Sequence, residues 1–182
     1  MLHTFIVYVD NKPGVLSRVV SLFRRRAFNI DSLTVGRTEK TDVSRMTIVV
    51  DTDADQAKRI VANVYKLVNV LLVDDITAQP AIIRDLALIK VAATPDARSQ
   101  VLDLANVFRA RVVDVAPDSL TIEITGTEDK IDRLLDVLHP LGLLEVVRTG
   151  QVAMRRGAKP GSVATKEDAG MAVENDSVSY SV

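Results

Sequence analysis

The chain has 182 residues, of which 47% are apolar and 4% aromatic, enough to bury one large core or two small ones. Its 23 basic and 24 acidic side chains nearly balance, so it lacks the positive charge with which proteins bind nucleic-acid phosphates or anionic membranes. Cysteine is absent and no apolar run reaches the ~20 residues of a membrane span, which excludes disulfides, thiolate chemistry and a transmembrane helix. A β-rich pattern begins as early as Thr4, so we expect no signal or transit peptide and a cytoplasmic location.

The first half of the chain predicts four strands and two helices in the order βαββαβ. Apolar residues recur at helical spacing over residues 15–27, and we interpret this stripe as core. A second helix covers residues 57–67 and is entered through Thr52 or Asp53 as its cap. β-rich or alternating segments predict the strands, at residues 4–9, 30–36, 45–50 and 68–76.

The second half of the chain repeats this order. A helix opens at Thr94 and Pro95, with proline in its first turn, and another follows Thr127 and ends before Pro140. The strands are predicted at residues 86–92, 111–115, 120–125 and 143–147, the last extending toward residue 154.

Each βαββαβ set predicts a split βαβ fold, a four-stranded antiparallel sheet with both helices on one face. We therefore expect an α+β protein of two ferredoxin-like domains, residues 1–77 and 86–154, joined by a linker at 78–85. Domains this small leave one sheet face uncovered, so that face or a sheet edge is expected to meet another copy. Residues 155–182 show no sustained period and are rich in Gly, Ser, Ala and charge, so we expect them to be disordered.

Catalytic motifs do not stand out in this sequence. His3 and His139 are isolated, and we assign them surface or capping roles rather than metal ligation. No G-x-S-x-G, P-loop or G-x-G-x-x-G pattern occurs. Acidic pairs at 74–75 and 128–129 lie at element ends, where turns and helix dipoles explain them. The arginine run at 24–26 favours a solvated helix face over a binding patch.

The segment Pro13-Gly14 is the strongest candidate for a binding site. It forces a tight turn from strand to helix, and Gly14 lacks a Cβ, so a ligand can approach the backbone closely. The N–H groups of Gly14, Val15 and Leu16 lie at the helix start, where the helix dipole favours an anion such as a carboxylate. Asn11 adds a side-chain donor and acceptor just before the turn.

Asn29 is the second candidate, because it begins the next strand near the same edge of the sheet and can reach a ligand held by a neighbouring subunit. A free amino acid supplies a carboxylate for the N–H groups and an ammonium for amide or backbone oxygens. The alternatives are purely structural: Asn11 is the N-cap of the helix, and Asn29 satisfies a turn.

Three motifs in the first half and several in the second carry a family resemblance. The first half resembles the N-terminal ACT domain of acetolactate synthase regulatory small subunits, through N-x-x-G-x-L-x-R-V, N-I-[ED]-S-L-[TS]-V and S-R-M-T, whose fixed positions are all present. The second half is similar to the same family in LALIKV, FRARVVDV, LTIEITGTEDKID and EVVRTGQVAMRRG. The resemblance spans residues 1–157. The pair Lys12-Pro13 departs from the acidic-small pair common there, and Pro13 stiffens the turn.

This resemblance implies a regulatory subunit without catalytic residues or cofactors of its own. Such subunits bind the large catalytic subunit, which carries thiamine diphosphate, Mg²⁺ and FAD, raise its activity in valine, leucine and isoleucine biosynthesis, and make it sensitive to valine. They dimerise through their ACT domains and hold valine between them. Carried over to this chain, the resemblance assigns Asn11, Gly14, Val15 and Leu16 to the carboxylate site, completed by Asn29 and Ile30.

Three rival functions remain open at this point. A stand-alone amino-acid-sensing ACT module regulating another enzyme fits the first half alone. An RNA-binding pair of split βαβ domains needs aromatics on the central strands, where the third strand has Met46, Ile48 and Val50. A small hydrolase of the acylphosphatase kind needs an Arg and Asn around a phosphate loop, and Pro13-Gly14 is a poor substitute.

Overall fold

The chain folds into two compact units. A computed structural model describes residues 1–157. Unit 1 comprises residues 1–81 and resumes at Arg155, and unit 2 comprises Ile82–Met154. Disorder was predicted for residues 155–182. The prediction is wrong at its start, where Arg155 ends a strand and the N–H of Arg156 donates to Pro80 O, and residues 158–182 lie outside the described residues.

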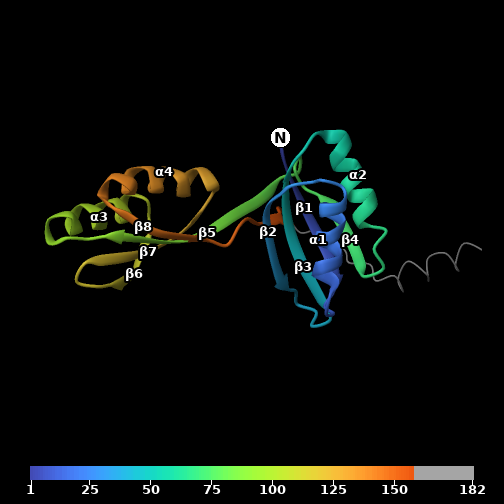
Figure 1. Ribbon diagram of the computed structural model, residues 1–182, viewed down its shortest axis with the longest axis horizontal. Helices are drawn as coiled ribbons and strands as arrows, with labels where there is room; N and C mark the ends of the chain where they lie inside the picture. Colours follow the sequence, from blue (N-terminus) through green and yellow to red (C-terminus); the bar gives the residue numbers. More distant parts are fainter. Residues whose placement is uncertain (158–182) are drawn as a thin grey trace, which may run out of the picture. The chain divides into compact units, whose positions relative to one another are not determined.

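Unit 1 is a four-stranded antiparallel sheet with two helices on one face (Figure 1). Its sheet order is β2-β3-β1-β4, the order of a split βαβ fold, and Phe5 of β1 lies opposite Ile48 of β3 and Asp75 of β4. Asp53 caps the second helix by accepting a 2.8 Å hydrogen bond from the N–H of Gln56. The elements are β1 (Leu2–Asp10), α1 (Val15–Arg25), β2 (Ile30–Arg37), β3 (Val43–Asp51), α2 (Ala54–Val64) and β4 (Val70–Asp75).

The core of unit 1 forms between the helices and alternate residues of the central strands. Because strand side chains alternate between faces, every second residue of β1 and β3 points toward the helices. The core residues are Phe5, Val7 and Val9 of β1, Met46, Ile48 and Val50 of β3, Val70 and Val73 of β4, Val15, Val19, Leu22 and Phe23 of α1, and Ala57, Ile60 and Val64 of α2. The exposed residues Leu16 and Val20 do not belong to this core, so the prediction that the whole stripe of the first helix is buried is wrong.

Unit 2 repeats the arrangement, with sheet order β6-β7-β5-β8 and a further strand, β9, paired with β5. The two predicted βαββαβ folds are thus confirmed. β5 begins at Ala81, inside the segment predicted as a linker, and β9 is separate from β8 rather than an extension of it. The elements are β5 (Ala81–Ala92), α3 (Pro95–Val107), β6 (Arg111–Val115), β7 (Ser119–Gly126), α4 (Glu128–Leu138), a 3₁₀ turn (His139–Leu141), β8 (Leu143–Arg148) and β9 (Val152–Arg155).

The first helix of each unit ends in a Schellman motif with an unusual residue at the left-handed position. In unit 1 the N–H of Phe28 donates to Phe23 O at 3.1 Å and the N–H of Ala27 donates to Arg24 O at 3.1 Å, with Ala27 at φ 56°. The rings of Phe23 and Phe28 meet edge to face, the apolar contact that accompanies this motif. Arg109 takes the same position after α3, at φ 53°. Both positions are ones that glycine occupies at lower cost.

His3 is buried, and the prediction of a surface or capping role for it is wrong. Only 6% of it is exposed, and its Nδ1 lies 3.1 Å from Asp75 Oδ2. Partial burial by itself raises the pKa of Asp75, but hydrogen bonds from the hydroxyl and N–H of Thr77 and from the His3 ring outweigh it and hold the pKa below its ordinary value. The acidic residue at this strand end is therefore part of a polar cluster rather than a simple turn residue.

We expect Asp75→Asn to lower the free energy of unfolding by about 1 kcal/mol near neutral pH, because hydrogen bonds to a carboxylate are stronger than those to an amide. The lowered folded-state pKa means that this stabilisation is fully present above about pH 4, the ordinary pKa of an aspartate, and is lost as the pH falls from there through the lower folded-state pKa. Urea unfolding of both proteins at falling pH should show their stabilities converging in acid. The exposed Asp103→Asn in α3 serves as control, and a difference that grows in acid would contradict the account.

Ala27→Gly should raise the free energy of unfolding by up to about 1 kcal/mol, because glycine adopts the left-handed conformation without the steric cost of a Cβ. Thermal unfolding followed by circular dichroism measures the effect. Ala57→Gly inside α2 is the matched control and should destabilise. Destabilisation by both substitutions would show that the motif does not strain Ala27.

Candidate functional site

Helix α1 begins without a side-chain cap, as the Pro13-Gly14 segment suggested. Gly14 is its N-cap residue, at φ 81° and ψ −7°, and no side chain hydrogen-bonds to the first turn. The first helical hydrogen bond runs from the N–H of Arg18 to Gly14 O at 3.1 Å. Among residues 1–157, no acceptor bonds the N–H groups of Leu16 or Ser17, whereas that of Val15 donates to Lys12 O at 3.4 Å. The free donors therefore include Ser17, which the sequence reading missed.

Gly14 is required by its backbone angles and not by crowding. A Cβ built on Gly14 would meet no atom within 4 Å, so space above the turn is open to a ligand. Its positive φ, however, is one that L-residues adopt only at a cost. The helix start thus combines an exposed backbone, unpaired donors and the positive end of the helix dipole.

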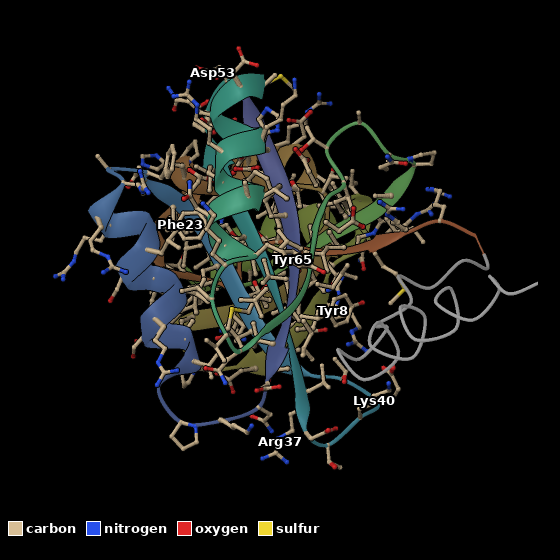
Figure 2. The ribbon with its side chains drawn as sticks, turned by 90° about the vertical axis from the view of Figure 1, so that its right-hand side faces the viewer. Tyr8, Phe23, Arg37, Lys40, Asp53 and Tyr65 are labelled. Atoms are coloured by element: carbon tan, nitrogen blue, oxygen red, sulfur yellow. The ribbon has the colours of Figure 1, made fainter. Side chains whose placement is uncertain are left out.

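Asn11 ties the β1–α1 loop to the β2–β3 loop and is not the N-cap of α1. Its backbone N–H donates to Asp42 O at 2.7 Å, and its side-chain Nδ2 donates to Thr41 O at 3.0 Å. Figure 2 shows these two loops at the same end of the unit, with Arg37 and Lys40 marking the β2–β3 side. The capping alternative for Asn11 is therefore wrong, and its side chain is exposed beside the turn.

A polar cluster anchors the turn to the start of β4. Asn69 Nδ2 donates to Asp10 Oδ2 at 2.9 Å, and Arg18 Nη1 donates to Asn69 Oδ1 at 2.6 Å. Lys12 Nζ lies 3.2 Å from the same oxygen of Asp10. Sequence reasoning missed Asn69, because it lies 51 residues beyond Arg18 and no local pattern marks it. The cluster orients the helix start without using its free N–H groups.

Apolar side chains lie next to the free donors. Val15 is buried in the core, with 4% exposed, whereas Leu16 is 42% and Val20 is 36% exposed on the same helix. An anion site bordered by an exposed aliphatic surface suits a small ligand that carries both a carboxylate and an apolar group.

Asn29 and Ile30 lie at the other end of α1. Asn29 is exposed, and Ile30 starts the edge strand β2, where it pairs with Val50 and packs against the core. The 11 residues of α1 make it about 16 Å long, so these two residues are separated from the Gly14 turn by the length of the helix. The structure therefore does not bring the six predicted residues together within one chain. A ligand small enough to fit the turn reaches Asn29 only if that residue comes from another copy.

Other kinds of site find no support in the described part of the chain. Across residues 1–157, apart from the side chain of Asp96, which is not described, no group of three or more His, Cys, Asp or Glu side chains is placed to hold a metal ion. Among the helices described, none is long and apolar enough to cross a membrane.

Comparison with known proteins gives a consistent result over both units. The family model "AHAS small subunit-like ACT domain" matches residues 5–72, and the model "Small subunit of acetolactate synthase" matches residues 84–157. The chain is 50% identical over 159 residues to a probable acetolactate synthase small subunit of Archaeoglobus fulgidus, covering 87% of this chain and 99% of that one. It is 48% identical over 157 residues to an acetolactate synthase small subunit of Mycobacterium bovis, covering 86% and 94%.

A solved structure agrees with these sequence relatives. The crystal structure of the acetolactate synthase small subunit from Thermotoga maritima matches with a TM-score of 0.81 and 36% identity. The match covers 87% of this chain and 99% of that one.

Gly14→Ala should lower the free energy of unfolding by about 1 kcal/mol or more, because alanine at a positive φ is strained. Gly36→Ala is the matched control: a Cβ there also meets open space, but its φ is ordinary, so stability should hold or rise. Urea unfolding measures both. Equal effects of the two substitutions would show that the left-handed turn does not depend on glycine.

Proposed function

Since the chain belongs to the family of acetolactate synthase small subunits, we propose that it is a regulatory subunit that binds the large catalytic subunit, raises its activity and makes it sensitive to valine. The chemistry belongs to the partner, which carries thiamine diphosphate, Mg²⁺ and FAD. This chain acts by binding and by changing shape, in the cytoplasm, and needs no cofactor of its own.

The uncapped start of α1 is the observation that carries this proposal. The N–H groups of Leu16 and Ser17 are free to bind valine's carboxylate, aided by the helix dipole. The exposed side chain of Leu16 offers an apolar surface to the isopropyl group. The amide oxygen of the exposed Asn11 side chain is an acceptor for the ammonium, because the bond to Thr41 O uses only its Nδ2.

The distance between the two groups of site residues favours a valine site shared by two copies. Asn29 and Ile30 lie a helix length away from the Gly14 turn in the same chain. In a side-by-side dimer of unit 1, the Asn29 region of one copy is positioned to close over the turn of the other. The edge strand β2, which starts at Ile30, is the element through which such a dimer pairs most simply.

A site between two copies explains how valine inhibits. A ligand shifts an equilibrium only through different affinities for its two states, and a molecule clamped between two subunits has a different affinity for each of their relative orientations. The catalytic subunit then responds to the orientation that valine favours. By linkage, binding of the catalytic subunit changes the affinity for valine by the same factor.

The stand-alone sensing module is the alternative, and the match of residues 84–157 to the small-subunit family speaks against it. The RNA-binding alternative fails for a different reason from the one expected. Met46, Ile48 and Val50 face the helices and are buried, so they do not lie on the opposite face of the sheet, where RNA would bind. On that face the central strands present Tyr8, half-buried, with the Arg45 guanidinium 5.8 Å from its ring. One aromatic is a poor stacking platform for RNA.

The test is acetolactate formation by the cognate catalytic subunit, with and without this chain, while valine is titrated. We expect activation by the chain and inhibition by valine. Asn29→Ala should keep the activation and raise the half-inhibitory valine concentration about tenfold or more, equivalent to about 1.4 kcal/mol of lost binding. Asn106→Ala, an exposed asparagine of α3, is the matched control and should leave both properties unchanged.

Three outcomes would contradict parts of the proposal. Absence of activation would remove the regulatory role and favour the stand-alone module. Activation without valine inhibition would keep the partner and remove the effector. Normal inhibition of Asn29→Ala would keep the effector and remove the shared site.

A further inference from the structure

A basic groove follows one side of α1 and begins at Ser17, in the first turn of the helix. It has a volume of about 510 Å³ and is lined by Ser17, Arg18, Ser21, Arg24, Arg25 and Leu67. Five of these residues lie on one side of α1, and Leu67 comes from the connection between α2 and β4. We call this surface the α1 groove.

The α1 groove carries positive charge that its own unit does not neutralise. Residues 11–30 contain five basic side chains and no acidic one, in a chain whose net charge is −1. Within the described part of the chain, no carboxylate forms an ion pair with Arg18, Arg24 or Arg25. The helix dipole accounts for Arg24 and Arg25 in the last turn, but it disfavours Arg18 near the start. The helix dipole therefore does not explain all three arginines of the α1 groove.

The sequence beyond the described residues has the complementary pattern. Residues 158–182 contain four acidic and two basic side chains. All four acids fall within residues 167–176, at Glu167, Asp168, Glu174 and Asp176, with Met171 and Val173 between the two pairs. Acids that flank an apolar centre match a groove that has arginines beside Leu67.

We propose that residues 167–176 bind to the α1 groove of the same chain, with their carboxylates on Arg18, Arg24 and Arg25 and an apolar side chain against Leu67. This contact goes beyond the proposed regulatory function and does not depend on it.

The residues just before the tail, Arg155 and Arg156, are held on unit 1 by two contacts. Arg155 Nη2 pairs with Asp74, and the N–H of Arg156 donates to Pro80 O at 2.8 Å. Asp74 lies at the end of β4, an edge strand of the sheet of unit 1, and Pro80 lies directly before β5. The segment therefore starts on the unit that carries the groove.

The distance to the α1 groove is short enough for the intervening residues. The groove lies near the start of β4, because Arg18 hydrogen-bonds Asn69 just before that strand. The six residues of β4 span about 20 Å. The ten residues from 157 to 167 extend to about 33 Å. Because this connection joins the segment to the unit that carries the groove, binding is intramolecular, which favours even weak ion pairs.

The absence of cysteine makes a direct test possible, because a single introduced cysteine is the only site for a nitroxide label. Ala172→Cys in the full ¹⁵N-labelled chain, once labelled, should reduce the amide peak intensities of residues 17–25 and 67–69 more than about twofold. Residues 32–37 of β2 should keep theirs. The broadening should disappear at high salt, which screens exposed charge pairs.

Charge variants identify the contact. Arg24→Gln with Arg25→Gln should abolish the broadening, and so should neutralising the four tail acids with Gln and Asn. The matched control, Lys58→Gln with Arg59→Gln on α2, should retain it. Circular dichroism of each variant verifies that unit 1 is folded.

Two results would overturn the proposal. Intensities at residues 17–25 that do not change on labelling would show that the segment does not bind there. Broadening that appears only when ¹⁵N-labelled chain without nitroxide is mixed with nitroxide-labelled, unenriched chain would assign the contact to a second copy. Neither result bears on the regulatory role, because the experiment contains no catalytic subunit.

Discussion

The positive φ of Gly14 is the constraint on which the functional end of unit 1 depends. It lets the chain pass from β1 to α1 in four residues, and it leaves the first helical N–H groups facing solvent without a cap. Any residue able to cap this helix locally would occupy the donors that an anionic ligand needs. The nearby polar side chains instead hold the loops in place. Asn11 hydrogen-bonds Thr41 O, and Asn69 hydrogen-bonds both Asp10 and Arg18. The result is a rigid turn with unused donors.

The length of α1 decides whether the six candidate residues can contact one ligand within a single chain. The turn and Asn29 lie at opposite ends of the helix, because β1 and β2 run parallel with α1 as the crossover between them. An amino acid is too small to bridge that distance, so the six residues serve one ligand only when two copies meet. The proposed regulation by valine between two copies depends on this separation, because binding and subunit orientation are then thermodynamically linked.

Local sequence signals predicted much of the fold, but they failed for residues whose burial depends on contacts with distant parts of the chain. The two βαββαβ sets, the cap at Asp53 and the turn at Gly14 all follow from residue type and spacing. Leu16 and Val20 share the helical spacing of the core but lie on its margin, because the sheet contacts only part of the helix surface. The burial of His3 depends on Asp75 and Thr77, more than 70 residues away, and no period in the sequence reports such a pairing.

The sequence by itself determined the class of fold, the doubling of the domain, the family and the uncapped helix start, because these depend on periodicity and on short motifs. Only the tertiary structure decided that Asn11 links two loops by hydrogen bonds and does not cap α1, and that the backbone N–H of Ser17 is a free donor. It also decided that Asn29 is remote from the turn, and that Arg18, Arg24 and Arg25 border one groove. The physical reason is that hydrogen-bond partners and distances across an element are set by packing between segments far apart in the chain, which local patterns do not record.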